Sequence, residues 1–236
     1  MTDVLIFLIV FGAIFVQSVS GFGLALVSMP LLALVIDLHT ATPLVALISV
    51  VAEIIILIHY REALDLRSVA RFALASILGV PVGVLFLAQV DQAIVLPLLG
   101  IIVLGYALYA LLGPRLPELR SVHWAHGLGF IAGVLGGAYN MPGPAVVIYA
   151  NCRGWPPAQF KSNLQGFFVL TSILILGAHV VAGHVTPDVL RDFALTLPAI
   201  LLGALTGFAL DRRLNPLAFR RVVQVMLIGI GLSLIL

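Results

Sequence analysis

Eight apolar blocks, most of them about twenty residues long, limit what this chain can fold into. A helix of roughly twenty apolar residues spans the ~30 Å hydrocarbon core of a bilayer. Only 9% of the 236 residues are charged and 62% are hydrophobic, whereas a soluble domain has about a quarter of its residues charged. The chain is therefore predicted to be an integral membrane protein. The blocks cover residues 4–36, 43–59, 69–88, 93–112, 122–150, 160–182, 189–210 and 218–236.

The start of the chain and its cysteine content argue against several other classes. Asp3 stands where a cleavable signal peptide would carry a basic region, so the first block is predicted to belong to the mature fold. The single Cys152 excludes an internal disulfide and predicts no metal cluster. No cofactor and no nucleic-acid partner are predicted.

The first and fifth blocks are interrupted near their middle. As a single helix, residues 4–36 would be about 50 Å long, which is too long for an upright span. Gly and Pro, which weaken helices, gather within residues 18–23 and 136–144. In lipid, a broken backbone is tolerated only where protein or a water-filled cavity satisfies its polar groups. Each long block is therefore predicted to be a broken helical hairpin.

The two long blocks head two similar halves of the chain. Gly79-x-x-x-Gly83 in the first half corresponds to Gly203-x-x-x-Gly207 in the second. Small residues at this spacing favour close helix packing, either within the chain or in a homodimer. The predicted repeats are residues 1–113 and 122–236, joined by a linker at 114–121.

The basic residues favour one arrangement of these halves. If all eight blocks crossed the membrane, the twelve Lys and Arg residues would divide equally between the two sides. If each long block instead returns to its own side, only Arg191 lies opposite the rest, as the positive-inside rule favours. The predicted fold is an all-α polytopic membrane protein with two inverted repeats. Each repeat has a re-entrant hairpin (4–36 or 122–150) and three transmembrane helices, and both termini lie outside the cytoplasm.

Hairpins that enter from opposite faces would bring their tips together near the bilayer midplane. The second arms, beginning near Gly23 and near Pro142, would then point their N-termini at the centre. A helix N-terminus carries free N–H groups and about half a positive charge, which suits an anion. No Lys or Arg lies in the middle of an apolar block. The predicted substrate-binding residues are Gln17, Ser18, Ser20, Gly21, Gly23, Gly137, Asn140, Met141, Gly143, Asn163 and Gln165.

Several polar residues near these tips have two interpretations. Ser18 and Ser20 either face the substrate or bond back to their own helix. Glu53 is the only carboxylate deep inside an apolar block, and an intramembrane acid is a candidate for proton coupling. Its alternative is a structural glutamate that is protonated or hydrogen-bonded. Lys161, Arg153 and Arg71 either attract anions at the cytoplasmic mouth or anchor the chain at the interface.

The glycine and proline patterns at the two tips resemble those of a known family. Ser20-Gly21-Phe22-Gly23 is followed by Met29-Pro30, and Gly133-Val134-Leu135-Gly136-Gly137 is followed by Pro142-Gly143-Pro144. These stretches are similar to the TauE/SafE sulfite exporter family, also called the 4-toluene sulfonate uptake permease family. The resemblance implies transport of small anions, often sulfite or organosulfur acids such as sulfonates, across the bacterial cytoplasmic membrane.

The predicted function is therefore secondary transport of a small anion through a lipid bilayer, with the proton as the candidate coupling ion. A passive anion channel and a carrier of small carboxylates remain as alternatives. An enzyme is not predicted, because neither an HExxH nor a GxSxG motif occurs in the chain.

Overall fold

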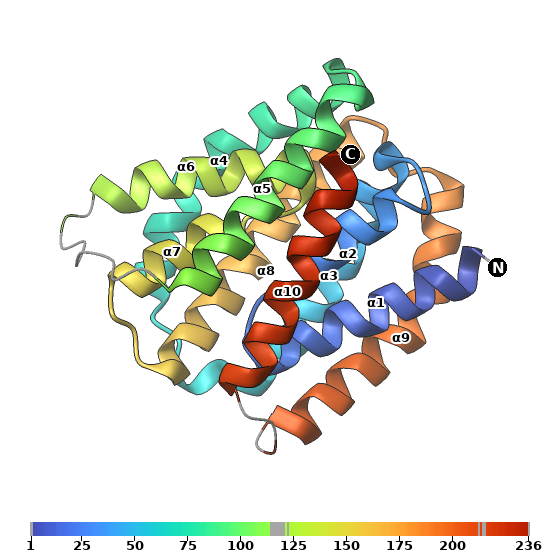
Figure 1. Cartoon of the computed structure of the whole chain (residues 1–236). Helices are drawn as coiled ribbons and strands as arrows, with labels where there is room; N and C mark the ends of the chain where they lie inside the picture. Colours follow the sequence, from blue (N-terminus) through green and yellow to red (C-terminus); the bar gives the residue numbers. More distant parts are fainter. Residues whose placement is uncertain (1, 114–120, 122, 212, 214–215, 236) are drawn as a thin grey trace.

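The computed structural model describes residues 2–113, 121, 123–211, 213 and 216–235, and within them the chain is helical with no strand (Figure 1). The predicted all-α class is confirmed. Apart from Ser121, the predicted linker lies outside the described residues. The helices are α1 (Thr2–Ser20), α2 (Leu24–Ala33), α3 (Leu38–Tyr60), α4 (Leu66–Gln89), α5 (Gln92–Leu112), α6 (His123–Tyr139), α7 (Gly143–Cys152), α8 (Pro157–Val181), α9 (Pro187–Asp211) and α10 (Pro216–Ile235), with a 3₁₀ turn η1 (Arg61–Ala63) after α3.

The two halves begin their long helices with different residues. Asp37, Asp65 and Asp91 precede α3, α4 and α5, and each carboxylate accepts N–H groups of the first turn. Hydrogen bonds from Ser68 hold the pKa of Asp65 below its usual value. In the second half α8, α9 and α10 each begin with proline, whose fixed φ suits the first helical position.

Among the described residues, six helices are long and apolar enough to cross a membrane, namely α1, α3, α4, α5, α8 and α9. Five of them coincide with predicted spans, and the sixth predicted span corresponds to α10, a helix of 20 residues. The break in block 4–36 follows Ser20, within the predicted stretch 18–23, but α1 begins at Thr2 and α2 already ends at Ala33. The arms of the first hairpin are therefore unequal, with 19 and 10 residues.

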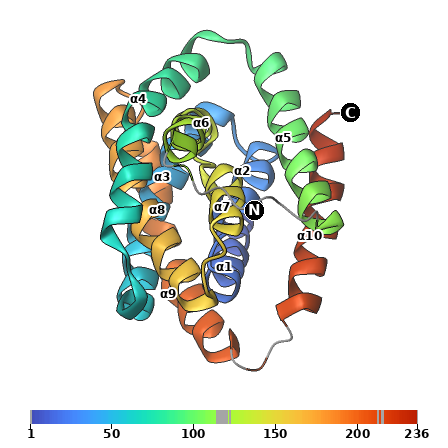
Figure 2. The same ribbon diagram turned by 90° about the vertical axis from the view of Figure 1, so that its left-hand side faces the viewer.

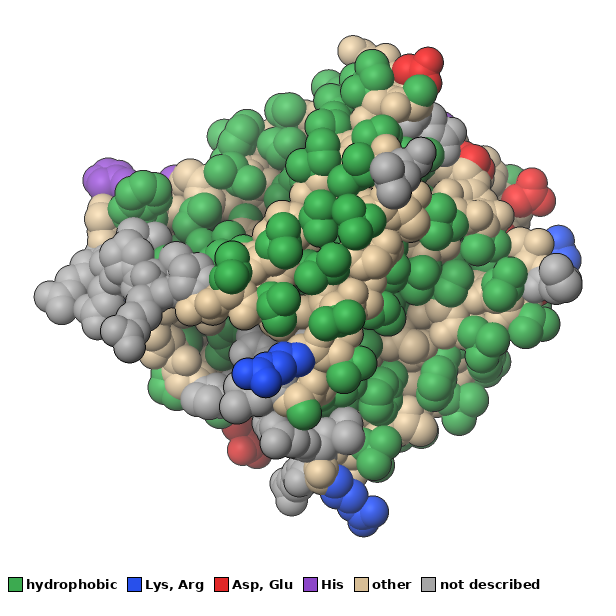
Figure 3. All heavy atoms as spheres, in the orientation of Figure 1, with side chains coloured by type: hydrophobic (Ala, Val, Ile, Leu, Met, Phe, Trp, Pro, Cys, Tyr) green, Lys and Arg blue, Asp and Glu red, His purple; other side chains and the backbone are tan. Residues whose placement is uncertain are grey.

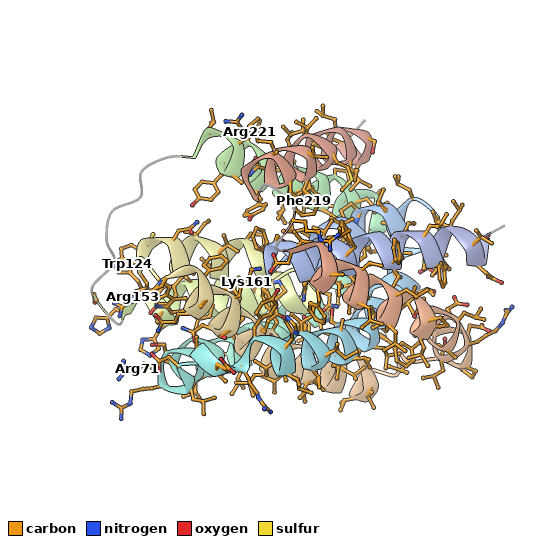
Figure 4. The ribbon with its side chains drawn as sticks, turned by 90° about the horizontal axis from the view of Figure 1, so that it is seen from below. Arg71, Trp124, Arg153, Lys161, Phe219 and Arg221 are labelled. Atoms are coloured by element: carbon orange, nitrogen blue, oxygen red, sulfur yellow. The ribbon has the colours of Figure 1, made fainter. Side chains whose placement is uncertain are left out.

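The two broken hairpins enter the bundle from opposite ends. The first begins and ends beside the start of α9. Asp3 lies 3.8 Å from Arg191, and burial together with the nearby His39 lowers the pKa of His184. In Figure 4, Trp124 at the start of α6 and Arg153 just after α7 lie together at the other end.

That other end carries most of the described basic residues and is called the basic end below. Arg71 and Arg153 both lie near the Tyr149 hydroxyl there. Arg191 belongs to the opposite end, together with Asp3. Lys161 bonds Tyr60 and Asp211, which places the neighbouring Arg61 and Arg213 at this end. Asp65 bonds Asn163, close to Lys161, and so places Arg67 there as well, while Figure 4 shows Arg221 on the same side of the bundle as Lys161.

The helix pairs of the bundle cross between the two halves. α4 packs on α6 and α9 on α1, while α3 packs on α8 and α5 on α10. Figure 2 shows the hairpins α1–α2 and α6–α7 in the centre, between α3, α4 and α8 on one side and α5 and α10 on the other. The hairpin tips are therefore enclosed by helices.

Glycines make the closest of these contacts. A Cβ atom on Gly83 would come within 2.2 Å of the Val134 carbonyl oxygen on α6. A Cβ atom on Gly207 would come within 2.4 Å of the Ser18 side chain on α1. Both small-residue motifs therefore serve packing within the chain, and the homodimer stays a prediction.

The outside of the bundle is covered by apolar side chains. Figure 3 shows hydrophobic atoms across the face formed by α5 and α10, with basic side chains near its lower edge. Leu78 on α4 and Leu205 on α9 are 72% and 63% exposed. Such a surface is suited to contact with lipid chains.

Candidate functional site

The first hairpin turns at two glycines. α1 ends at Ser20, and Gly21 and Gly23 adopt φ values of 83° and 115°. Residues other than glycine rarely adopt these backbone angles. Glycine is therefore required for the chain to leave α1 and start α2 within three residues. The predicted break in the first block is confirmed.

Two glutamines hold this tip in place. The Gln165 side chain on α8 donates to the Gly21 carbonyl oxygen at 2.7 Å, and Gln17 donates to the Gln165 side-chain oxygen at 3.4 Å. The Gln17 oxygen in turn accepts the N–H of Leu24 at 2.8 Å. One of the free N–H groups at the start of α2 is thus used by the chain itself, which leaves the next residues of that turn for a ligand.

The second hairpin turns at Asn140, which has a φ of 54°. The N–H groups of Asn140 and Met141 bond back to the carbonyls of Gly136 and Leu135, which ends α6. α7 then begins at Gly143 and continues with Pro144, which has no N–H. This N-terminus therefore offers fewer donors than the sequence pattern suggested, although its dipole is intact.

A small, partly open cavity lies where the two tips meet. It receives the N-terminal ends of both short helices, since Gly23, Pro142 and Gly143 all border it. Both positive helix ends therefore border one space, an arrangement that suits an anion. The lining residues are Gln17, Gly23, Ala25, Leu26, Glu53, Asn140, Met141, Pro142, Gly143 and Phe168.

Glu53 and Asn140 bring unpaired oxygen atoms to this cavity. Both side chains are almost completely buried, at 5% and 2% exposure. Glu53 Oε2 and Asn140 Oδ1 have no hydrogen-bond partner among the described residues. Burial of an unpaired polar atom costs free energy, so these atoms are suited to a proton or to a ligand that carries a donor.

Two serines form hydrogen bonds with the side chains of Asn140 and Glu53. Asn140 Nδ2 donates to the Ser49 hydroxyl at 3.3 Å, and Ser172 on α8 bonds the Glu53 carboxyl. Ser49 and Glu53 are four residues apart on α3 and therefore share one face. The sequence analysis missed both serines, although the spacing of Ser49 to Glu53 in an apolar helix was a usable signal.

Of the eleven predicted binding residues, five line this cavity. Gln17, Gly23, Asn140, Met141 and Gly143 are brought together there. Gly21 and Gln165 lie behind the first tip and hold it by the hydrogen bond described above.

The other four predicted residues lie away from this cavity. Gly137 packs against α4, where a Cβ would come within 2.2 Å of the Val80 carbonyl oxygen. The side-chain oxygen of Asn163 accepts the Asp65 N–H at 2.7 Å, before α4. The Ser18 hydroxyl is buried with no partner among the described residues.

Ser20 borders a second cavity on the other side of the first tip. Its hydroxyl bonds back to the Val16 carbonyl at 2.8 Å, which is the second interpretation given above. This small, partly open cavity lies between the tip, α5 and α10, and it shares Gly23 and Leu26 with the first. Phe22, Tyr106 and Phe219 give it an aromatic lining.

Three further polar side chains lie beside the first tip at the basic end. Lys161 on α8 forms an ion pair with Asp211 on α9, with Nζ 2.9 Å from Oδ2. The Tyr60 hydroxyl on α3 lies 2.9 Å from the same oxygen. Asp211 and Tyr60 had no predicted role, because their contact joins the ends of helices that are far apart in sequence.

No metal centre emerges in the described part of the chain. Groups of three or more His, Cys, Asp or Glu side chains that could hold a metal ion are absent from it. His179 and His184 place their Nδ1 atoms 3.0 Å apart, which is a hydrogen bond between two rings.

The comparisons with known proteins agree with this architecture. Residues 6–234 match the sequence profile of the family described as Sulfite exporter TauE/SafE. The chain is 28% identical over 230 residues to the "Probable sulfite/organosulfonate exporter TauE" of Cupriavidus necator, which covers 93% of this chain and 88% of that protein. It is 26% identical over 178 residues to the "Probable inner membrane transporter protein TsaS" of Comamonas testosteroni, with 72% of this chain and 74% of that protein covered. No solved structure matches. Because the family match extends over nearly the whole chain, the protein belongs to the TauE/SafE family of sulfite exporters.

Proposed function

We propose that this protein is a secondary transporter of small sulfur oxyanions, such as sulfite or a sulfonate, in the bacterial inner membrane. The observation that carries the proposal is the cavity between the hairpin tips, which both short-helix N-termini border. The substrate class rests on the family and on the printed names of the two relatives, an exporter of sulfite and organosulfonate and an inner membrane transporter.

The cavity provides what an oxyanion needs in a low-dielectric environment. Two positive helix ends and the Asn140 amide supply hydrogen-bond donors and partial charge without a buried Lys or Arg. Discontinuous helices that meet at the interface of two repeats are a common design of transporter sites. We therefore interpret the two halves as inverted repeats, with the basic end in the cytoplasm.

Transport in reconstituted vesicles tests the proposal. Purified protein in liposomes is expected to give saturable uptake of labelled sulfite that unlabelled sulfite on the opposite side accelerates. Sulfate, simple carboxylates and short sulfonates serve as competitors. Single-channel currents without counterflow would instead support a passive channel. Competition by carboxylates alone would show that the substrates are carboxylates and not sulfur oxyanions.

Glu53 is proposed as the coupling group, because it is a buried acid that borders the cavity proposed to bind the substrate. Glu53→Gln is expected to retain anion binding while flux loses its dependence on pH, since glutamine cannot exchange a proton. The measurement is initial flux across a pH series. Glu62→Gln in the exposed turn η1 is the matched control and should keep the wild-type profile. An unchanged profile in Glu53→Gln would remove Glu53 from the mechanism.

A further inference from the structure

The Lys161–Asp211–Tyr60 cluster lies directly beside the first hairpin tip. The Lys161 side chain is the nearest neighbour of Gly21, where a Cβ would come within 2.9 Å of Lys161 Cγ. The Tyr60 hydroxyl is also 3.2 Å from the Ser18 carbonyl oxygen at the end of α1. One turn further along α8 is Gln165, which holds the same tip. The first hairpin tip therefore lies between the cluster and the substrate cavity and contacts both.

Within the cluster, two donors bind one carboxylate. Lys161 Nζ lies 3.0 and 2.9 Å from the two oxygens of Asp211, and the Tyr60 hydroxyl lies 2.9 Å from one of them. The ammonium group also lies 4.8 Å from the centre of the Tyr60 ring, a cation–π contact. An ammonium and a phenol that converge in this way form an oxyanion site, which Asp211 occupies.

We propose that Lys161 and Tyr60 form an entry site for the transported oxyanion at the basic end, and that Asp211 occupies this site until the substrate replaces it. The proposal rests on the transport function proposed above. Sulfite and sulfonates present negatively charged oxygens of the same kind as a carboxylate, so the same two donors bind them. Replacement is reversible, because Lys161 can bind an anion from solution in place of Asp211, and the released Asp211 can bind a cation from solution.

The exposure of the pair suits such an exchange. The Lys161 and Asp211 side chains are 20% and 25% exposed. Water and ions therefore reach the pair, while its partial burial makes it stronger than a fully exposed pair. Figure 4 shows Lys161 among the helices and Arg221 at the outer edge of the bundle. Of these two cations, Lys161 is the one that packs against Gly21 of the tip.

Release of Asp211 also changes the support of the tip. With Asp211 bound, the ends of α3, α8 and α9 are joined beside Gly21 and Ser18. When an anion takes its place, α9 loses this ion pair and hydrogen bond to α8 and α3 but keeps the stacking of Phe208 on His59, so the tip loses its polar support on that side. Binding at the entry site and opening toward the cavity are thereby coupled.

Opposite effects of two substitutions test this proposal. Asp211→Asn removes the internal competitor and is expected to lower the apparent KM for sulfite at the basic end about fivefold, as for an ion pair of this exposure. Lys161→Met removes the anion-binding charge and is expected to raise that KM by about tenfold. The double variant should resemble Lys161→Met, because Asp211 acts through Lys161. The measurement is initial flux in inverted membrane vesicles.

The controls separate an entry site from a structural ion pair. Arg191→Met and Asp3→Asn remove a pair of the same chemistry at the opposite end, exposed by 70% and 55%, and should leave the KM unchanged. Melting temperatures in detergent show whether each variant is folded. If both Lys161→Met and Asp211→Asn raise the KM, the proposal is overturned and the pair only holds the helices. If the wild type moves no sulfur oxyanion, the proposed function itself fails.

Discussion

Replacement of Asn140 by aspartate is expected to reduce sulfite flux roughly 10- to 100-fold, because a hydrogen bond to a charged group contributes about 1.5–3 kcal/mol. Asn140 borders the cavity and is 2% exposed. The change keeps the size of the side chain but replaces its amide donors with a second carboxyl group beside Glu53. A negatively charged substrate is then repelled from the tip. Flux in reconstituted vesicles and anion-dependent thermal stabilisation are the measurements.

The backbone of Asn140 decides which variants are informative. Its φ of 54° is a left-handed conformation that Asn, Asp and Gly tolerate and that a branched or bulky residue does not. Leucine at this position would mix backbone strain with loss of the amide. Asn140→Gly isolates loss of the amide and should reduce flux less than Asn140→Asp. Asn151→Asp, on an exposed part of α7, is the matched control and should transport normally. Wild-type flux in Asn140→Asp would remove Asn140 from the site.

Replacement of Gly83 by alanine is expected to lower the free energy of unfolding by about 1–3 kcal/mol, the range for overpacking a well-packed core. The new Cβ would lie 2.2 Å from the Val134 carbonyl oxygen and 2.6 Å from the Ala138 nitrogen. Both neighbours are backbone atoms of α6, so no side chain can turn away and the helices must separate. The measurement is thermal unfolding of the purified protein in detergent.

Gly105→Ala provides the control for helix propensity. No atom lies within 4 Å of a Cβ placed on Gly105, so alanine there should be neutral or slightly stabilising. Because α6 leads directly into Asn140, Gly83→Ala should also reduce flux in the protein that remains folded. Equal melting temperatures for the two variants would contradict the proposed tight contact between α4 and α6.

The sequence by itself determined the class of protein and the places where its helices break. Blocks of apolar residues must become helices in lipid, since every buried backbone group needs a partner. Gly21, Gly23 and the stretch from Asn140 to Pro144 mark the two interruptions, because these residues end or prevent regular helix. The asymmetry of basic residues also indicated which ends of the chain lie together.

The tertiary structure decided which face of each helix meets the cavity. Asn163 and Gln165 are two residues apart in α8, yet Gln165 bonds the first tip and Asn163 bonds the Asp65 N–H. Residues that are two positions apart on a helix differ by about 200° around its axis, so their side chains point in nearly opposite directions. In a soluble protein, the apolar stripe would show which direction is inward.

That signal fails here because both the lipid-facing and the protein-facing sides of these helices are apolar. The sequence could therefore name the polar residues near the tips but not rank them. Lys161 and Asp211 illustrate the same limit, since fifty positions separate two side chains that lie 2.9 Å apart. Their contact exists only because α8 begins and α9 ends beside the same hairpin tip, a consequence of how the two halves pack against each other.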